Sequence, residues 1–105
     1  MDLTWADVGA ADAVAEGSPL VAEVEGEAVL IVRCGATLHA VEDRCTHDGQ
    51  ALGDAPVEDC EIICPRHGAR FCLRTGAALT PPAYEPLRRY PVREESGRVL
   101  IGVPG

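Results

Sequence analysis

Four side chains that bind soft and borderline metals stand in two short clusters near the middle of the sequence. The first cluster contains Cys45 and His47, the second contains Cys64 and His67, and sixteen residues separate the two clusters. Thiolate and imidazole ligands together bind zinc, so the ligand types alone leave zinc open. Structural zinc sites, however, usually pair like residues two to four positions apart within each turn. Here each turn supplies one Cys and one His, which is what a two-iron cluster needs if each loop is to contact both irons.

These two clusters resemble the cluster-binding boxes of the Rieske 2Fe-2S family. The first box is Cys45-Thr46-His47 and the second runs from Cys64 to Gly68. The similarity continues through nearly the whole chain: Leu38 to Arg44 resembles the family's approach strand, and Pro82-Ala83, Pro86-Leu87 and Tyr90 to Val92 resemble its proline loop and following strand. The resemblance implies that Cys45 and Cys64 bind one iron, and that His47 and His67 bind the other through ring nitrogens.

The implied ligand set has a consequence for the reduction potential. Replacing two thiolates by neutral imidazoles makes the oxidised cluster neutral instead of doubly negative, so an added electron is better tolerated. Clusters with two His ligands accordingly have potentials of roughly −150 to +300 mV, against about −400 mV for plant-type clusters with four Cys ligands.

Residues beside the two boxes depart from those of the respiratory Rieske proteins. Those proteins resemble this pattern but carry an extra Cys in each box, and a Ser and a Tyr whose hydroxyls bond to the cluster or its ligand. At the matching positions this chain has Gln50, Arg66, Ala69 and Phe71. Without those hydroxyl donors, the potential is expected near the low end of the range, at about −150 mV.

The remaining cysteines and the third histidine are expected to be structural. Cys34, Cys60 and Cys72 are interpreted as small, mostly buried apolar residues, since free Cys is among the most buried residue types. A Cys60 to Cys72 disulfide is conceivable but is disfavoured in a cytoplasmic protein. His39 is interpreted as an ordinary sheet histidine, because its spacing fits neither cluster.

No feature of the sequence predicts catalysis. All ligand positions on the two irons are filled by the implied set, and no independent nucleophile, base or phosphate-binding loop is recognised. Asp48 and Asp54 lie near the first box and are interpreted as solvated loop carboxylates rather than general bases. The protein is therefore expected to be an electron-transfer protein and not an enzyme.

Composition predicts one soluble all-β domain. The chain has 105 residues, 4% aromatic residues, and 19 Gly and Pro together, which favours many short strands joined by tight turns. Fourteen of the seventeen acidic residues lie in residues 1–61, and the net charge of −8 makes nucleic acid an improbable partner. No stretch resembles a signal peptide or a membrane span, and the odd number of cysteines favours a metal site over a disulfide framework, so a cytoplasmic location is expected.

The expected strands follow from apolar alternation and turn residues. They comprise residues 4–8, 20–24, 28–33, 37–42, 57–63, 69–73, 87–93 and 98–103. Pro91 is expected to make the strand 87–93 an edge strand or to place a bulge in it, and residues 80–83 are expected to form a stiff exposed loop.

The resemblance implies a small Rieske-type ferredoxin with an antiparallel β-sandwich base (1–43 and 82–105) and an inserted cluster-binding lobe (44–81). It would be a monomer that passes electrons from a flavoprotein reductase to a terminal oxygenase. Docking is expected at the rim formed by Asp48, Gln50, Arg66 and Pro82. Two alternatives stay open: a redox subunit of another system, such as nitrite reduction or iron-sulfur assembly, and a structural zinc-binding interaction module.

Overall fold

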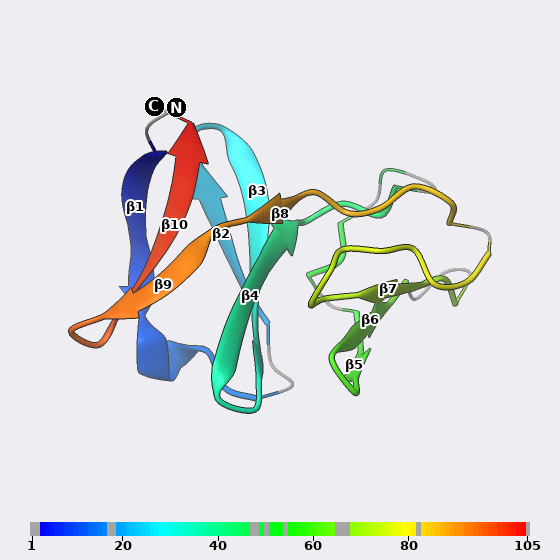
Figure 1. Ribbon diagram of the computed structural model, residues 1–105, viewed down its shortest axis with the longest axis horizontal. Coiled ribbons are helices and arrows are strands. Elements are labelled where there is room, and N and C mark those ends of the chain that lie inside the picture. Colours follow the sequence, from blue (N-terminus) through cyan, green and yellow to red (C-terminus); the bar gives the residue numbers. More distant parts are fainter. Residues whose placement is uncertain are drawn as a thin grey trace.

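The computed structural model describes residues 3–16, 19–46, 49, 51–53, 55–64, 68–81 and 83–104. These residues form three antiparallel sheets, and the two larger sheets lie together while a small sheet lies to one side (Figure 1). The elements are β1 (Leu3–Ala10), the 3-10 turn η1 (Ala11–Ala13), β2 (Leu20–Val24), β3 (Glu27–Cys34), β4 (Thr37–Glu42), β5 (Val57–Glu58), β6 (Glu61–Ile63), β7 (Arg70–Cys72), β8 (Arg89–Tyr90), β9 (Val92–Glu95) and β10 (Arg98–Pro104). The all-β prediction is confirmed.

The two sheets that lie together have the strand orders β1-β10-β9 and β2-β3-β4-β8. The small sheet, made of short strands, has the order β5-β6-β7. Every pair of neighbouring strands is antiparallel. Among the described residues, no helix is long and apolar enough to span a bilayer.

Strand β3 lies between two hydrophobic cores. Its residues 29 to 32 are fully buried. Val29 and Ile31 belong to the core shared with β10, whereas Leu30 and Val32 belong to the core shared with the small sheet. Alternate side chains of a strand point to opposite faces, so an uninterrupted apolar run is what a strand covered on both faces requires. Strand β3 is thus covered on both faces over residues 29–32.

Pro91 separates two strands that belong to different sheets. Strand β8 ends at Tyr90 and pairs with β4, and β9 begins at Val92 and pairs with β10. Proline has no backbone N–H to donate to a ladder, which favours an interruption at this position. The carbonyl of Pro91 still accepts a hydrogen bond from the N–H of Gly102 at 2.8 Å, so the chain crosses between the sheets while held to β10.

The single strand expected over 57–63 is wrong in detail. The segment is a tight hairpin, because Asp59 and Cys60 have φ values of 52° and 60° and reverse the chain between β5 and β6. Neither residue is Gly or Asn, the usual occupants of such turns, so the turn gives no strong signal in the sequence. On β7, Phe71 is fully buried whereas Arg70 and Cys72 are partly exposed, so the expectation that Cys72 is mostly buried is wrong.

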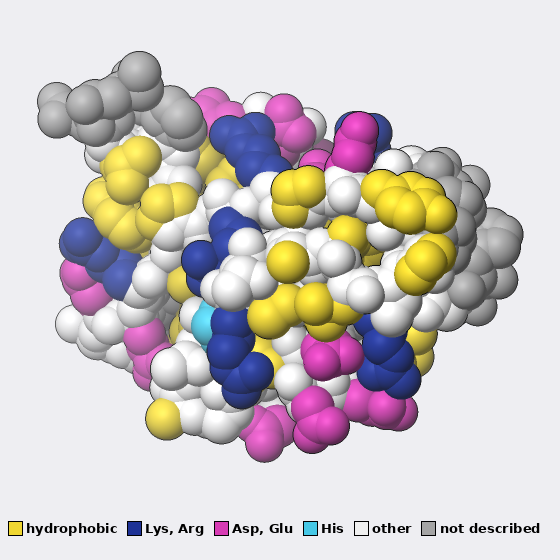
Figure 2. Space-filling model, turned by 45° about the vertical axis from the view of Figure 1, so that its right-hand side comes forward, with side chains coloured by type: hydrophobic (Ala, Val, Ile, Leu, Met, Phe, Trp, Pro, Cys, Tyr) yellow, Lys and Arg dark blue, Asp and Glu magenta, His cyan; other side chains and the backbone are white. Residues whose placement is uncertain are grey.

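Charged side chains of both signs are interspersed over the face drawn in Figure 2. Arg98 pairs with Asp7 at 3.0 Å, and Arg70 lies 3.3 Å from Glu61. Both pairs join an acid of the acidic half of the chain to an arginine of the basic half. Exposed pairs of this kind are screened by solvent and contribute little to stability, so their main effect is on the charge distribution.

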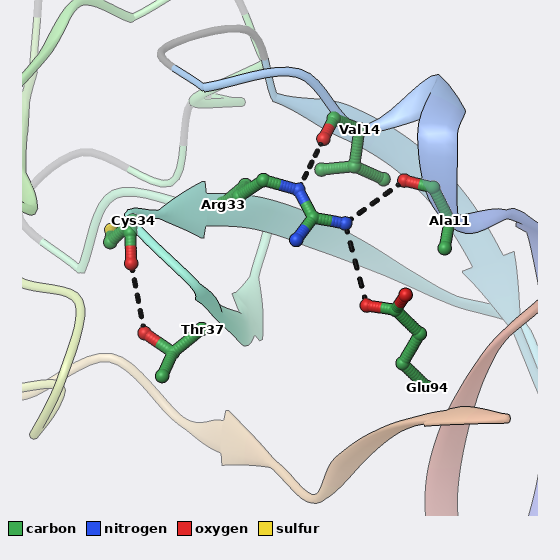
Figure 3. Close-up of polar contacts among 6 residues, drawn as sticks. All are labelled: Ala11, Val14, Arg33, Cys34, Thr37 and Glu94. Carbon is green, nitrogen blue, oxygen red and sulfur yellow. Dashed lines mark hydrogen bonds and ion pairs between the residues drawn. The ribbon is translucent and has the colours of Figure 1, made fainter. Parts of the chain in front are cut away.

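Arg33 connects β3 to the opposite layer (Figure 3). Its Nε donates to the carbonyl of Val14 at 2.8 Å, and its Nη2 donates to the carbonyl of Ala11 at 3.1 Å. The same nitrogen lies 3.5 Å from a carboxylate oxygen of Glu94 on β9. The half-buried guanidinium of Arg33, which lies at the end of β3 next to Cys34, thus satisfies the backbone carbonyls of Ala11 and Val14.

Candidate metal centre

The two loops that carry Cys45 and Cys64 are built in the same way. The N–H of Gly49 donates to the carbonyl of Cys45 at 2.8 Å, and the N–H of Gly68 donates to the carbonyl of Cys64 at 2.9 Å. Both glycines have left-handed backbones, with φ of 76° and 73°. Each cysteine therefore begins a compact turn that is closed four residues later by a glycine, the residue that adopts this conformation without steric cost.

Both cysteines are fully buried in one hydrophobic core. Cys45 and Cys64 each have an exposed fraction of 0%, and both belong to the core that contains Leu52, Phe71 and Leu73. An apolar, water-poor setting of this kind is the second determinant, after hydrogen bonding to the sulfurs, of the potential of a bound iron-sulfur cluster.

Hydrogen bonds fix both loops to their surroundings. The backbone N–H of Cys64 donates to the carbonyl of Ala69 at 2.7 Å. The hydroxyl of Thr46 donates to the carbonyl of Glu85 at 2.7 Å, which ties the first loop to the segment before β8. The carboxylate of Asp43 accepts the N–H of Leu52, also at 2.7 Å. These bonds position the two cysteine loops independently of any bound group.

The two histidines of the expected ligand set, His47 and His67, lie outside the described residues. So do the loop acids and the rim residues Asp48, Gln50, Asp54, Arg66 and Pro82. The structure places the thiols of Cys45 and Cys64 in one core, at equivalent positions of two similar loops. Two buried thiols fit a cluster that is held by both loops. The complete ligand set stays a prediction.

Two side chains beside the cysteines carry no hydroxyl. Ala69 and Phe71 are both fully buried and belong to the core that holds Cys45 and Cys64. Ala83 lies in the segment 80–83, for which an exposed loop is expected. It is only 3% exposed and belongs to the same core, so the expectation is wrong for Ala83. The expectation holds for Pro81, which is exposed. The apolar lining leaves less opportunity for side-chain hydrogen bonds to sulfur.

Residues 4–91 match the Rieske 2Fe-2S domain family. The chain belongs to this family. The ferredoxin subunit of 3-phenylpropionate/cinnamic acid dioxygenase from Shigella flexneri is 39% identical over 94 residues, which cover 80% of this chain and 89% of that protein. The solved ferredoxin of carbazole 1,9a-dioxygenase from Nocardioides aromaticivorans is 32% identical, with a TM-score of 0.89, and the match covers 93% of this chain and 96% of that one.

A third relative is the structure described as a complex of reduced oxygenase and oxidised ferredoxin in carbazole 1,9a-dioxygenase. The matched chain is 30% identical, with a TM-score of 0.87, over 92% of this chain and 91% of that one. The cofactor of this Rieske protein is therefore a 2Fe-2S cluster, and the protein is an electron carrier rather than a catalyst. The family assignment replaces the alternative of a structural zinc module at the two boxes.

The interpretation of Cys34 and Cys60 as free, buried thiols is wrong for this Rieske protein. The two form a disulfide, with Cα atoms 5.7 Å apart, that joins the end of β3 to the β5–β6 turn. The alternative Cys60 to Cys72 pairing does not occur: Cys72 is a partly exposed thiol. A hydrogen bond with the side chain of Thr75 is the largest cause that lowers the pKa of Cys72. Since Cys34 and Cys60 are 26 residues apart and on different sheets, no sequence pattern identified the pair.

His39, the one histidine among the described residues, is half-buried on β4. Burial is the main cause that lowers its pKa below 6.5, and the positive charges of Arg89 and Arg74 lower it further. The ring is therefore neutral at pH 7.

Proposed function

We propose that this Rieske protein carries single electrons from a flavoprotein reductase, which uses a nicotinamide cofactor, to a terminal oxygenase of an aromatic-ring dioxygenase system. Cys45 and Cys64 would bind one iron of the cluster, and His47 and His67 the other. The observation that carries the proposal is the pair of similar loops, each starting at a fully buried cysteine and closed by a left-handed glycine. When bound, the cluster supplies a one-electron acceptor and donor, with no position for a substrate.

The names of the relatives support the oxygenase as the electron acceptor. Two of them are ferredoxins of dioxygenases, and the third is described in complex with its oxygenase. We further propose a monomeric, cytoplasmic protein with one Rieske domain over 1–105. The separate small sheet and the second hydrophobic core support its division into a base (1–43 and 82–105) and a cluster-binding lobe (44–81).

Docking is proposed at the rim of the two boxes, formed by Asp48, Gln50, Arg66 and Pro82. Two exposed apolar side chains of the segment between β7 and β8 extend this surface: Leu79 is 46% exposed and Tyr84 is 81% exposed. Tyr84 directly precedes Glu85, whose carbonyl is bonded to Thr46 in the first box. Weak, transient redox encounters use small patches of this kind.

Ligation is tested on the purified protein by iron and acid-labile sulfide analysis together with the visible and electron paramagnetic resonance spectra. In the variant His47→Cys the added thiolate is expected to lower the reduction potential, because it adds negative charge to the cluster. His39→Asn is the matched control and is expected to leave the potential unchanged. An unchanged spectrum and potential in His47→Cys would mean that His47 is not a ligand.

Docking is tested by oxygenase turnover at increasing concentrations of this protein. Tyr84→Ala is expected to raise the concentration needed for half-maximal turnover several-fold, since aromatic side chains dominate small interfaces. Val21→Ala, at a site on β2 that is 48% exposed, is the control. Equal effects of the two substitutions would remove Tyr84 from the docking surface and leave the cluster assignment intact.

A further inference from the structure

Three metal-ligating side chains outside the two cysteine loops meet at one point. The side-chain ligand atoms of Cys34, His39 and Cys60 all lie within 4.8 Å of one another. Cys34 ends β3, His39 lies on β4, and Cys60 lies in the turn between β5 and β6. The three residues therefore come from two different sheets, and packing of the small sheet against β3 and β4 brings them together.

The strand register explains why the first two ligands share a face. Cys34 lies opposite Thr37, and Val32 lies opposite His39. Side chains that are directly opposite lie on the same face of a sheet, and alternate residues of a strand share a face. Cys34 and His39 are thus on the face that carries Val32, which packs in the core formed with the small sheet. Cys60 approaches this face from the small sheet.

The backbone of Cys60 indicates that its thiol has a role. Three turns of the described chain have two successive residues with positive φ: 25–26, 59–60 and 96–97. Gly occupies the second position in two of these turns, but Cys60 occupies it in the third, with φ of 60°. A side chain in this conformation has a steric cost that glycine would avoid. An unfavourable backbone conformation at a cysteine that meets two other ligand types is consistent with a role for its thiol.

Hydrogen bonding selects one tautomer of His39. The hydroxyl of Thr37 donates to the carbonyl of Cys34 at 2.9 Å (Figure 3). The same hydroxyl oxygen lies 3.2 Å from Nε2 of His39, so it accepts the Nε2 proton. Nδ1 then carries the lone pair, and an Arg89 nitrogen lies 3.5 Å away, at the limit of a hydrogen bond. A neutral imidazole with a weakly engaged lone pair is the form that binds metal.

We propose that Cys34, His39 and Cys60 form a second metal site, which binds Zn²⁺ when the two cysteines are reduced and is closed when they form the disulfide. Two thiolates and one imidazole form an established zinc ligand set that leaves one position open. Tetrahedral zinc at bond lengths of about 2.0–2.3 Å places its ligand atoms about 3.3–3.8 Å apart, which small side-chain rotations of this cluster provide. The proposal does not depend on the redox partners of the iron-sulfur cluster.

The chemistry of opening the site is thiol–disulfide exchange. A small-molecule or protein dithiol reduces the Cys34–Cys60 bond by two electrons and two protons, and is itself oxidised to a disulfide. Zinc then replaces one proton on each thiol, so that two protons are released for each ion bound. Disulfide sulfur carries no thiolate charge, which is why the oxidised pair does not hold the ion.

The open zinc position has room beside it. A pocket of about 410 Å³ adjoins the two cysteines and is also lined by Glu16, Asp59 and Arg74. A water molecule in this pocket can complete the tetrahedron. The charge of the ion is balanced by the two thiolates, so the arginines near the site do not oppose binding. His39 lies on β4, as expected of a sheet histidine, and the proposal adds a ligand role for it in the reduced protein.

The test uses the iron-loaded protein, oxidised with diamide or reduced with a phosphine, then incubated anaerobically with Zn²⁺ and desalted. Zinc and iron are measured by mass spectrometry. The reduced protein is expected to retain about one zinc ion per chain with its iron unchanged, and the oxidised protein almost none. Reduced Cys34→Ser and Cys60→Ser should lose the zinc, and His39→Ala should bind it at least about tenfold more weakly. Cys72→Ser is the matched control and should bind zinc normally.

Several results would overturn the proposal. These are the absence of zinc from the reduced protein, equal zinc in the oxidised and reduced proteins, full zinc binding by Cys60→Ser, and zinc uptake that displaces iron. The first two comparisons need no variant, so they decide the question even if a substitution prevents folding.

Discussion

Loss of the Cys34–Cys60 disulfide is expected to destabilise the protein by an amount that follows from chain length. The bond closes a loop with a sequence separation of 26 residues. In the chain-entropy account, a loop of that size lowers the entropy of the unfolded chain by about 12 cal/mol/K, which corresponds to about 3.5 kcal/mol at 25 °C. For a protein of 105 residues, with an unfolding entropy of about 0.22 kcal/mol/K, this is a decrease in Tm of about 15 °C.

The measurement is thermal unfolding of oxidised, iron-loaded protein, followed by far-ultraviolet circular dichroism and by cluster absorbance. Cys34→Ser and Cys60→Ser should both unfold about 15 °C below the parent. The double variant should be no less stable than either single variant, because both remove one bond. Cys60→Gly should recover about 1 kcal/mol relative to Cys60→Ser, since glycine adopts φ near 60° without the steric cost.

Cys72→Ser is the control, because Cys72 is a partly exposed thiol outside the disulfide. It should change Tm by no more than about 2 °C, as most surface substitutions do. If Cys34→Ser matches the parent in Tm under oxidising conditions, the reasoning is refuted: the disulfide would then not constrain the unfolded chain.

Four further outcomes are expected. The parent should have a midpoint potential of about −150 mV by voltammetry, and a value above about 0 mV would contradict the argument from missing hydroxyl donors. Ala69→Ser should raise the midpoint by about 50 mV if its hydroxyl bonds more strongly to the reduced cluster, since about 1.4 kcal/mol corresponds to 59 mV for one electron. Phe71→Ala leaves a cavity in the core that contains Cys45 and Cys64. It should lower the free energy of unfolding, measured by chemical denaturation, by about 3–5 kcal/mol and should speed the loss of iron. Unchanged stability would mean that neighbouring side chains refill the core. The pKa of His39 is lowered in the folded state, so the unfolded chain binds the proton first and the free energy of unfolding should fall as pH decreases below 6.5. His39→Asn should remove that part of the pH dependence. A stability that rises on acidification through this range would show that the pKa is shifted in the opposite direction.

The fold class and the strands with clear patterns could be read directly from the sequence. Residues 28–32 of β3 are an uninterrupted apolar run, and such a run is what a strand covered on both faces requires. Pro91 indicated an irregularity in the strand expected over 87–93, because its backbone has no N–H to donate, although the separation into β8 and β9 of different sheets was not predicted. In both cases the information is local: a few neighbouring residues restrict the backbone, whatever the rest of the chain does.

The candidate cluster site was predictable for a related reason. The cysteines of the two boxes stand next to histidine and glycine within short turns, so that spacing alone specifies the ligand types and the compact loops. The burial of Cys45 and Cys64 in one core is a tertiary property, but it follows from the position of both loops beside the apolar residues of β6 and β7.

The Cys34–Cys60 disulfide and its contact with His39 could not be predicted from the sequence. The turn at Asp59 and Cys60 lacks the glycine that identifies such turns, so the segment was expected to be one continuous strand. Even with the hairpin placed correctly, Cys34 and Cys60 lie on different sheets. Residue patterning therefore predicted the iron-sulfur chemistry, since the proposed ligands lie in local motifs. Only the packing of the small sheet against β3 and β4 decided which of the other cysteines and histidines meet, because contacts between distant segments depend on how whole sheets are placed.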